Sequence, residues 1–535
     1  MRDYPPEVRR KVMESLIFLT EKRDGSVKGR LCANGSIQRA YITKEEASSP
    51  TVTLEAVILT CLIDAMEGRD VAIVDIPNAF IQTPNEKLKE HHQQDFMKVR
   101  GRVAELLLEF QPEVYSDYVV YERGSPVIYL LILMALCGMM TSSLLFYRKL
   151  RKSLEKEGFK FNPYDMCVGN KEIQGSPLTV TFHVDDIKAS HKKSTVIDGF
   201  IKWCRMHYED AVKRIAPSRG KIHDYLGITL DYSLPGKVQL YMIQYIESVL
   251  KEFKFSEEVK SHKKVNTPAA AHLFQVNPEA TPLSKEKKEE FHTTVAKLLF
   301  LTKRTRPDLQ PAVPFLCTRV QAPDEDDWKK LLRVLKWLES TKGLRLTLEA
   351  EGDGKVLFLG WWPDAAFAVH STDMRSHTGS QASAGKGSFN VISSKQKLNT
   401  RSSTEAELVA ADDVLPQALW TRMFLEHQGY SSETTIYQDN TSAMLLERNG
   451  MESSSKRTRH INVRFYFIKD CIDKKQVQVK YCPTKEMKGD YPSKPLQGSL
   501  FKKHLRDMMN LQDGQQECVE ESTPGQSASP PDGNS

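Results

Sequence analysis

Cysteine is scarce in this chain, and no two cysteines are separated by only two residues. The nine cysteines among 535 residues therefore favour reduced thiols inside a cell over a disulfide framework or a zinc site. A secretion signal is also missing, because the N-terminus MRDYPPEVRRKVMES carries charges and two prolines where an apolar core is required. We therefore expect an intracellular protein that is not secreted.

Neither sign of charge dominates, and the one apolar run that could suggest a membrane span is interrupted. Lys and Arg number 75 against 69 Asp and Glu, so the net charge of +6 permits contact with nucleic acid without demonstrating it. Gly124–Tyr147 holds no charge, yet Gly138 and Thr141 interrupt its apolar residues before the about 20 that a span needs. Either a span or a buried strand, turn and helix fits this run, and the interruptions favour the second.

The length predicts three to four domains, at about 150 residues per domain, and the apolar pattern fits a mixed α+β protein of two or three units. Weakly periodic segments at Lys260–Pro282, Glu349–Gly354 and Gln512–Ser535 separate the blocks, and the last is predicted to be disordered. The expected strands are Val71–Ile76, Leu178–His183, Val356–Trp362, Ser388–Ser393, Thr434–Gln438 and Val477–Tyr481. The expected helices are Ser143–Lys156, Gln244–Phe253, Lys285–Thr302, Asp326–Ser340, Thr404–His427, Asn440–Glu447 and Arg464–Asp473.

Acidic residues end two of the expected strands in the first block. Asp75 lies near the end of one strand, and Asp185 and Asp186 follow another. A carboxylate there is costly unless it binds a cation or a partner, and carboxylates that hold two Mg²⁺ ions can activate one oxygen and stabilise another. In the alternative interpretation Asp75 caps the following turn and the Asp pair forms a solvated hairpin tip. Spacing alone favours this second interpretation.

The segments around these acids resemble the reverse transcriptases of copia-type retroelements. TFHVDDIKAS is similar to the Tyr-x-Asp-Asp strand–turn–strand signature, and VAIVDIPNAFIQT to the first catalytic motif, usually DVKTAFLNG. Between them MALCGMMTSSLLFYRKL resembles LYGLKQSPRAWYxKL, a turn of the nucleotide pocket that contains Gly138 and Ser142 here. DGSVKGRLCANGSIQR resembles the fingers segment, which implies that Lys28 and Arg30 contact the incoming triphosphate. These motifs occur in the order of the family, from about Glu21 to Leu496.

The last block resembles the ribonuclease H domain that follows the polymerase in such elements. LGWWPDAAFAVH, SSTEAELVAAD, IYQDNTSAMLL and VKYCPTKEMKGDYPSKPL match its segments in order. The resemblance implies four carboxylates around two magnesium ions: Asp364, Glu407, Asp439 and Asp490. Glu405 competes with Glu407, since each lies three residues after a Ser or Thr that could cap a helix. We choose Glu407 because such enzymes place the metal-binding Glu before an aliphatic residue, here Leu408.

Two further features have a structural and a functional interpretation. His460 lies in the basic run Lys456–His460, where it is either a surface residue or part of a loop that contacts substrate in the nuclease site. The basic run itself would bind a phosphate backbone. We expect the aromatic residues to pack in the core and not to stack on nucleic acid: Trp361, Trp362, Trp420 and Phe424.

The resemblance implies a polymerase right hand of fingers, palm and thumb, followed by a ribonuclease H-like mixed-sheet α/β domain. We expect fingers and palm over 1–255, thumb and connection helices over 256–350, the ribonuclease H-like domain over 351–511 and a disordered tail over 512–535. The implied cofactor is Mg²⁺ or Mn²⁺, two ions per active site. The implied partners are an RNA template, a DNA primer, RNA/DNA hybrids, deoxynucleoside triphosphates and other products of a retroelement polyprotein, in a cytoplasmic particle or the nucleus and without a membrane.

The chain also departs from the family pattern. His183 replaces the usual Tyr before the Asp pair, Pro77 and Asn78 replace Lys-Thr, and the pocket turn lacks its usual Lys and Pro. No protease, integrase or zinc-knuckle signature occurs, so the chain resembles the downstream part of a polyprotein or a degraded copy. Three functions follow as hypotheses: a polymerase with ribonuclease H, a catalytically silent nucleic-acid-binding protein, and a protein in which only the ribonuclease H half is active.

Overall fold

The chain forms two compact units in the computed structural model. The described residues are 5–21, 27–85, 94–210, 213–260, 265–353, 355–449, 462–512 and 515. The first unit comprises Met1–Val52, Ala72–Phe161 and Met166–Ser218, and the second comprises Thr53–Val71, Asn162–Asp165 and Arg219–Ser535. Domain boundaries at residues 255 and 350 stay predictions, and apart from 512 and 515 the expected tail over 512–535 lies outside the described residues.

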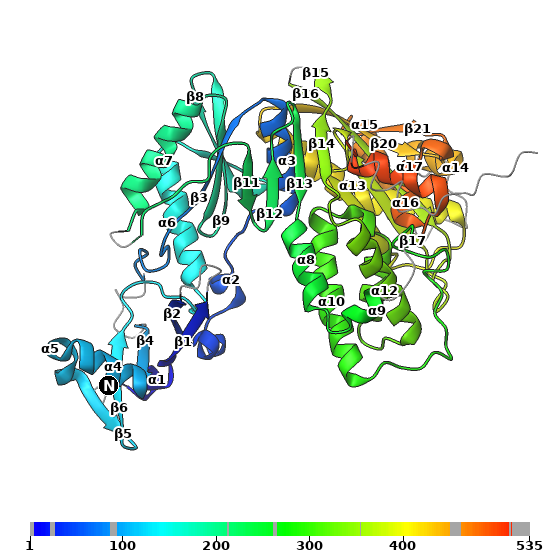
Figure 1. Ribbon diagram of the computed structural model, residues 1–535. Coiled ribbons are helices and arrows are strands. Elements are labelled where there is room, and N and C mark those ends of the chain that lie inside the picture. The colour runs from blue at the N-terminus through cyan, green and yellow to red at the C-terminus, as the bar shows by residue number, and fades with distance from the viewer. Residues whose placement is uncertain are drawn as a thin grey trace, which may run out of the picture. The chain divides into compact units, whose positions relative to one another are not determined.

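The first unit begins with a five-stranded sheet in the order β2-β1-β4-β6-β5 (Figure 1). Met97, Val99 and Ile128 belong to its buried core. Its strands are β1 (Met13–Glu21), β2 (Val27–Ala33), β4 (Phe96–Arg100), β5 (Val119–Glu122) and β6 (Ser125–Leu131), and short helices α1 (Pro6–Arg10), α2 (Lys44–Ala47), α4 (Arg102–Phe110) and α5 (Pro112–Tyr115) accompany them.

The uncharged run folds as a strand, a turn and a helix, which confirms the favoured interpretation. Strand β6 ends at Leu131, a turn follows in which Gly138 has a φ of 90°, and helix α6 begins at Ser142. Among the described helices, none is both long enough and apolar enough to cross a membrane.

A second sheet of the first unit has the order β3-β10-β9-β8-β7. Helices α6 and α7 pack on it (Figure 1). The rings of Tyr147 in α6 and Phe182 in β9 lie 6.0 Å apart. The expected strands Val71–Ile76 and Leu178–His183 are confirmed as β3 and β9. The elements are β3 (Asp70–Asp75), β7 (Lys160–Asn162), β8 (Asp165–Ile173), β9 (Ser176–His183), β10 (Asp186–His191), α6 (Ser142–Lys156) and α7 (Ser194–Tyr208).

The second unit contains a five-stranded sheet, β11-β12-β13-β14-β18, and a group of helices. Helix α3 (Leu54–Met66) packs on β13 and β14 and is buried on all sides from Ala56 to Ala65, as its apolar sequence requires. The strands are β11 (Ile222–Tyr225), β12 (Ile228–Asp231), β13 (Lys237–Tyr241), β14 (Leu346–Ala350) and β18 (Gly385–Lys386). The helices are α8 (Ile243–Glu252), α9 (Ser256–Lys260), α10 (Lys285–Arg304), α11 (Ala312–Arg319) and α12 (Glu325–Ser340).

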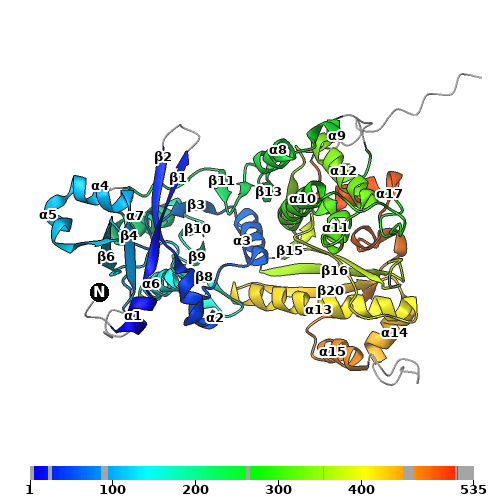
Figure 2. The ribbon, with the colours of Figure 1, turned by 90° about the horizontal axis from the view of Figure 1, so that it is seen from below.

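A mixed sheet in the order β19-β17-β16-β20-β21 completes the second unit, with β15 paired to β16. Strand β16 is antiparallel to β17 and parallel to β20, and β20 is parallel to β21. Helix α13 runs along β16 and β20 (Figure 2). The strands are β15 (Gly352–Asp353), β16 (Val356–Ala366), β17 (His377–Ser383), β19 (Asn390–Lys395), β20 (Ser431–Gln438) and β21 (Gln478–Tyr481). The helices are α13 (Ser403–His427), α14 (Thr441–Asn449), α15 (Asn462–Asp473), α16 (Asp490–Ser493) and α17 (Gly498–Met509).

The mixed α+β class is thus confirmed, and the expected elements of both units recur with small shifts at their ends. Strand β16 is the exception, because it extends four residues past the expected end at Trp362 and places Asp364 inside the strand. The expected strand Ser388–Ser393 begins two residues later, at Asn390. The expected core aromatics divide into two pairs: Trp361 and Phe424 are buried, whereas Trp362 and Trp420 are only half-buried.

Candidate functional site

Three aspartates of the first unit meet where β3 ends and where β9 turns into β10. The backbone N–H of Ile76, directly after Asp75, donates to the carbonyl of Asp185 at 3.0 Å. Asp186 begins β10 and pairs with His183 across the hairpin, while Val184 turns the chain with a φ of 57°. Two strands distant in sequence therefore bring Asp75, Asp185 and Asp186 to one edge of the sheet.

The charges of these aspartates influence one another. Burial raises the pKa of Asp185, and repulsion from Asp75 raises it further, against the attraction of His183 and Arg30. Burial also raises the pKa of Asp186, as does repulsion from Asp185 and Asp75. Asp75 itself is half exposed and forms a 2.9 Å ion pair with Lys213. The group is thus an electronegative, partly open site that already holds one cation.

The predicted fingers segment and pocket turn lie against each other in the first unit. A side chain at Gly138 would place its Cβ 2.0 Å from the carbonyl oxygen of Ala33, and one at Gly35 would come within 2.2 Å of the Gly138 oxygen. Only glycine permits these approaches. The Met140 N–H donates to Gln38 Oε1 at 2.8 Å, which ties the two segments together.

The other predicted substrate-binding residues of this unit differ in their surroundings. Ser142 is buried and donates its hydroxyl to the carbonyl of Leu136 at 2.7 Å, so its side chain closes the turn. Arg30 is exposed on β2 and lowers the pKa of Asp185 by attraction, which places it in electrostatic range of the aspartates. The side chain of Lys28 lies outside the described part of the chain.

A second group of carboxylates forms in the second unit. In the part of the chain that the structure describes, one trio of possible metal ligands has its ligand atoms within 4.8 Å of one another, namely Asp364, Glu407 and Asp439. They come from strand β16, helix α13 and the residue after strand β20. Asp75, Asp185 and Asp186 are not gathered as closely as this trio.

Two glycines allow the fourth predicted acid, Asp490, to approach this trio. A Cβ at Gly489 would lie 2.3 Å from the Trp362 carbonyl oxygen, and one at Gly379 would lie 2.3 Å from the Ser493 nitrogen. Helix α16 can therefore press against β16 and β17, and the Ser493 hydroxyl donates to the Asp364 carboxylate.

Glu407 and its competitor Glu405 occupy different places at the start of α13. Ser402 caps this helix by accepting from the Glu405 N–H at 3.2 Å, and the Glu405 carboxylate accepts from the Arg401 N–H at 2.7 Å. Glu407 instead joins Asp364 and Asp439, and its Oε2 is buried with no hydrogen-bond partner among the described residues. Glu405 thus stabilises the helix end, and Glu407 lies in the carboxylate group.

Lys494 is an internal cation of this group that the sequence did not lead us to expect. Its Nζ lies 3.1 Å from Asp364 Oδ2 and 2.5 Å from Asp490 Oδ1. Burial lowers the pKa of Lys494, but attraction by the two aspartates outweighs this and raises it overall. The signals available in sequence were its position four residues after Asp490, typical of a helical ion pair, and its place in the SKPL segment. Lys213 of the first unit had no such signal.

The crowding of acids also governs their protonation. Burial raises the pKa of Glu407 well above its ordinary value, and repulsion from Asp364 and Asp439 adds to this. Burial raises the pKa of Asp439 and of Asp490 as well, again with repulsion from Asp364. A site of this kind would gain free energy from a bound cation, because the cation would relieve both the burial and the repulsion. His460, the remaining predicted site residue, lies outside the described residues.

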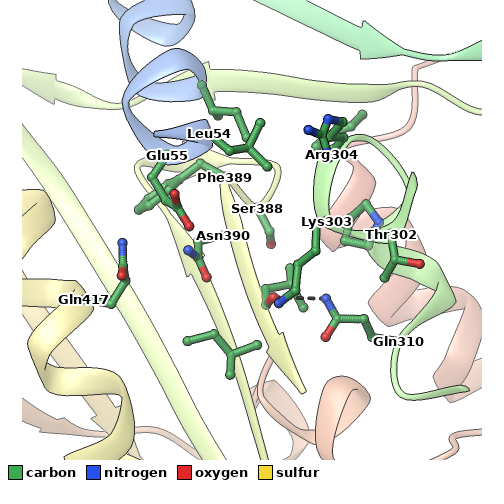
Figure 3. Close-up of a pocket in the computed structure, with 15 residues that line it drawn as sticks. Leu54, Glu55, Thr302, Lys303, Arg304, Gln310, Ser388, Phe389, Asn390 and Gln417 are labelled. Atoms are coloured by element: carbon green, nitrogen blue, oxygen red, sulfur yellow. Dashed lines mark hydrogen bonds between the residues drawn. The ribbon is translucent and has the colours of Figure 1, made fainter. Parts of the chain in front are cut away.

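A partly open cavity of about 140 Å³ lies elsewhere in the second unit (Figure 3). Glu55 of α3, Lys303 of α10 and Asn390 of β19 line it together with Gln310 and Gln417. Its volume suits a few water molecules. None of the catalytic or substrate-binding residues predicted from sequence lines this cavity, so it is not the candidate site.

Comparison with known proteins finds relatives among the polyproteins of plant transposons. The chain is 24% identical over 493 residues to the retrovirus-related Pol polyprotein from transposon TNT 1-94 of Nicotiana tabacum, an alignment that covers 90% of this chain and 34% of the relative. It is 25% identical to the corresponding polyprotein from transposon RE2 of Arabidopsis thaliana, over 90% of this chain and 31% of the relative. The chain thus spans about a third of the length of these relatives. No family model matches it.

The fold and the two carboxylate groups define a mixed α+β protein with acidic, oxygen-ligand sites. The chain is similar to the retrovirus-related Pol polyproteins of copia-type transposons, as its motifs predicted. Among solved structures it is similar to apo telomerase from Candida tropicalis, at 13% identity and a TM-score of 0.31, over 62% of this chain and 63% of that chain. That similarity is too low to support any conclusion about this protein.

Proposed function

We propose that the protein is the RNA-directed DNA polymerase of a copia-type retrotransposon with a fused ribonuclease H. The observation that carries this proposal is that each compact unit contains its own group of carboxylates, at the positions that the family motifs predict. Nucleotidyl transfer and phosphodiester hydrolysis both depend on carboxylates that hold divalent ions around a phosphate. In this proposal residues 1–255 supply the fingers and palm, 256–350 the thumb and connection, and 351–511 the ribonuclease H-like domain.

In the polymerase half, Asp75, Asp185 and Asp186 would act at the primer terminus. Arg30 is exposed and within electrostatic range of Asp185, so it would bind the triphosphate of an incoming deoxynucleotide, together with Lys28. The backbone turn at Gly138 would form the floor of the nucleotide pocket. Since the Ser142 hydroxyl is already bonded to Leu136, we assign Ser142 to shaping this turn.

In the nuclease half, Asp364, Glu407, Asp439 and Asp490 would position the RNA strand of an RNA/DNA hybrid. Glu407 supplies a buried oxygen without a partner among the described residues, which suits a group that ligates a cation. Lys494 would leave its ion pairs when a cation of higher charge takes its place.

The donor sets of both sites fit Mg²⁺ or Mn²⁺, because such hard cations prefer carboxylate oxygens. When bound, two such ions per site would activate an attacking oxygen and stabilise the leaving oxygen. The residues of this chain would hold the reacting phosphate in place between the carboxylates and the nearby cations Arg30 and Lys213.

A basic groove in the second unit would bind the backbone of the nucleic acid. It has a volume of about 290 Å³ and is lined by His272, Lys329, Lys330, Arg333 and Lys336, four of them on α12. Binding through phosphates weakens with salt, by about 0.9 in the log–log slope for each phosphate that is neutralised. The double substitution Lys329→Gln with Lys336→Gln should therefore reduce that slope by about 2 for a hybrid duplex.

The proposed partners are an RNA template, a DNA primer, RNA/DNA hybrids and deoxynucleoside triphosphates, with other products of the polyprotein. The protein would encounter these partners in a cytoplasmic particle or in the nucleus.

Primer extension on poly(A)/oligo(dT) with Mg²⁺ or Mn²⁺ tests the polymerase half. We expect the full chain to incorporate dTTP, and Asp185→Asn to abolish incorporation. The matched control is Asp117→Asn, an exposed acid of the same unit outside the group. For the nuclease half, a labelled RNA/DNA hybrid should be cleaved by the wild type and by Asp353→Asn, but not by Asp364→Asn. No incorporation in either metal would contradict the polymerase, and no cleavage would contradict the nuclease.

A second candidate function, hybrid cleavage without polymerisation, is favoured by one difference between the sites. The carboxylates of the second unit are gathered within ligand distance, whereas Asp75 is half exposed and paired with Lys213. Cleavage without incorporation in the same assays would identify this function. Binding without either activity would identify a catalytically silent nucleic-acid-binding protein.

A further inference from the structure

A third pocket of the second unit opens beside the buried carboxylate group. It has a volume of about 400 Å³, within the range of small-molecule sites. Trp362 and Tyr437 line it, and each lies two residues before an acid of the group, Asp364 and Asp439. Thr484, which lies between the lining residues Pro483 and Glu486 in the sequence, forms a hydrogen bond with Asp439. Whatever occupies this pocket therefore lies next to the proposed site of cleavage.

Aromatic rings form the walls of this pocket. Trp362 and Tyr437 stack on each other with centroids 4.8 Å apart and an angle of 8° between the planes. The Lys488 ammonium lies over Trp362, 4.4 Å from the ring centroid. Tyr481 lines the pocket at the end of β21, is 54% exposed and has no stacked ring in the described part of the chain. A flat ligand would find an open aromatic face on Tyr481.

The charges of the pocket are balanced and do not favour a phosphate. Lys488 and Lys503 face Glu486 and Asp507, so the lining has no net charge from these four residues. The Lys503 ammonium already donates to the carbonyl of Lys485 at 2.6 Å. A phosphate would meet two carboxylates here, whereas the amino group of a nucleobase could donate to them.

His504 adds a neutral polar ring to this lining. Its side chain is only 2% exposed, and neither ring nitrogen has a hydrogen-bond partner among the described residues. Burial lowers the pKa of His504 to about 4, and repulsion from Lys503, Lys488 and Lys494 contributes. The ring is therefore uncharged at neutral pH, which again suits an uncharged, flat ligand.

We propose that this pocket binds an unstacked nucleobase of the nucleic-acid strand that is held at the adjacent carboxylate group. The base stacks on Tyr481, and Glu486 and Asp507 accept hydrogen bonds from the N–H groups at its edge. Stacking of a base on an aromatic side chain is sequence-tolerant and is a common way to hold single-stranded nucleic acid. This proposal rests on the proposed nuclease function, since it takes its ligand from the same substrate.

The test measures base stacking without cleavage, in the full chain and in EDTA. The probe is an RNA/DNA hybrid with a single-stranded RNA overhang that carries one 2-aminopurine, whose fluorescence falls when it stacks. We expect the wild type to quench the probe at least twofold, and Tyr481→Ala to lose the quenching and about tenfold in affinity. Tyr481→Phe should retain both, because it keeps the ring. Phe358→Ala, at an exposed aromatic of β16 outside the pocket, is the matched control.

The same hybrid with an abasic overhang separates the base from its backbone. It should bind the wild type about as weakly as the base-bearing probe binds Tyr481→Ala. Equal affinity for the two probes, or unchanged quenching by Tyr481→Ala, would overturn the proposal. Because Tyr481 is exposed at a strand end, its substitution leaves the core intact, and circular dichroism of the variant checks this.

The outcome for the pocket is separate from that for the proposed nuclease. If Mg²⁺ produces no cleavage of the hybrid while Tyr481-dependent quenching persists, the proposed nuclease fails and the base pocket stands. If cleavage occurs and quenching is independent of Tyr481, the pocket fails and the nuclease stands.

Discussion

The two carboxylate groups of this protein differ in how the fold holds them. Asp75, Asp185 and Asp186 lie at strand ends and in a hairpin turn, where Asp75 is 52% exposed and paired with the equally exposed Lys213. Asp364 and Glu407 project from the interior of a strand and a long helix and are buried, with Lys494 bound between Asp364 and Asp490. The first group is open to solvent and has one exposed ion pair, with Lys213. The second group is buried, and Lys494 pairs with two of its acids.

The difference in exposure determines how strongly each carboxylate group depends on a nearby cation. An exposed group is solvated by water, so its acids tolerate the absence of a cation at low cost. Buried acids depend on a cation for their stability, which couples the folding of the second unit to its electrostatics.

The largest expected effect separates the two sites by activity. Asp185→Asn should lower primer extension by on the order of 10³-fold or more and leave hybrid cleavage within twofold, and Asp364→Asn should do the reverse. The reason is that each substitution removes a charged ligand from one group only. Steady-state rates of both activities on the same preparations measure this, and a loss of both activities in either variant would contradict two independent sites.

Next in size is a dependence of stability on pH that belongs to the second unit. Burial raises the pKa of Glu447, beside Gln438, from 4.5 to about 7, a change that corresponds to about 3 kcal/mol. The folded state therefore holds a proton that the unfolded state has lost, and the unfolding free energy should fall as pH rises from about 4.5 to 7.

Glu447→Gln should remove most of that dependence and be more stable than the wild type at pH 8. Urea unfolding at pH 5 and pH 8 checks this. Asp70→Asn is the control, since Asp70 forms a partly exposed ion pair with Arg219. An unchanged pH dependence in Glu447→Gln would show that other buried acids, Glu407 above all, dominate.

The two lysines that pair with the carboxylate groups, Lys494 and Lys213, provide a smaller and more direct comparison. In the absence of divalent ions, Lys494→Met should lower the unfolding free energy by about 1–2 kcal/mol, because it leaves Asp364 and Asp490 unneutralised. The effect is limited because the Lys494 side chain is 40% exposed and solvent screens its charge. Mg²⁺ should then raise the melting temperature of this variant by more than that of the wild type. Lys213→Met should change stability by less than about 1 kcal/mol. Thermal unfolding with and without Mg²⁺ tests both, and equal effects would erase the contrast between open and enclosed groups.

The smallest effect is expected at His183, where the family usually has Tyr. Attraction by His183 lowers the pKa of Asp185 and Asp186. The same charge competes with Mg²⁺ for these aspartates, so His183→Tyr should change the Mg²⁺ concentration for half-maximal primer extension by about threefold or less. Titration of primer extension with Mg²⁺ is the measurement, and a lower maximal rate at saturating Mg²⁺ with an unchanged half-maximal concentration would indicate a steric role.

Much of the molecule could be predicted from periodicity and motif order. The apolar runs located β3, β9, β20 and the long helices because burial imposes its period directly on the sequence. Strand β16 ended too early in our prediction because Pro363 and Asp364 interrupt its apolar run, whereas in the fold both continue the pairing with β17. The choice of Glu407 over Glu405 was also available from sequence, through the residue that follows it.

Sequence by itself determined which residue types were available for chemistry, their order, and the resemblance to copia-type Pol polyproteins. Only the tertiary structure decided that Lys494 and Lys213 neutralise the acids, that Ser142 closes a turn, and that Trp362 borders a pocket with Tyr481. The physical reason is that burial, charge compensation and pocket walls arise from residues that are distant in the chain. No local pattern records which of them will become neighbours.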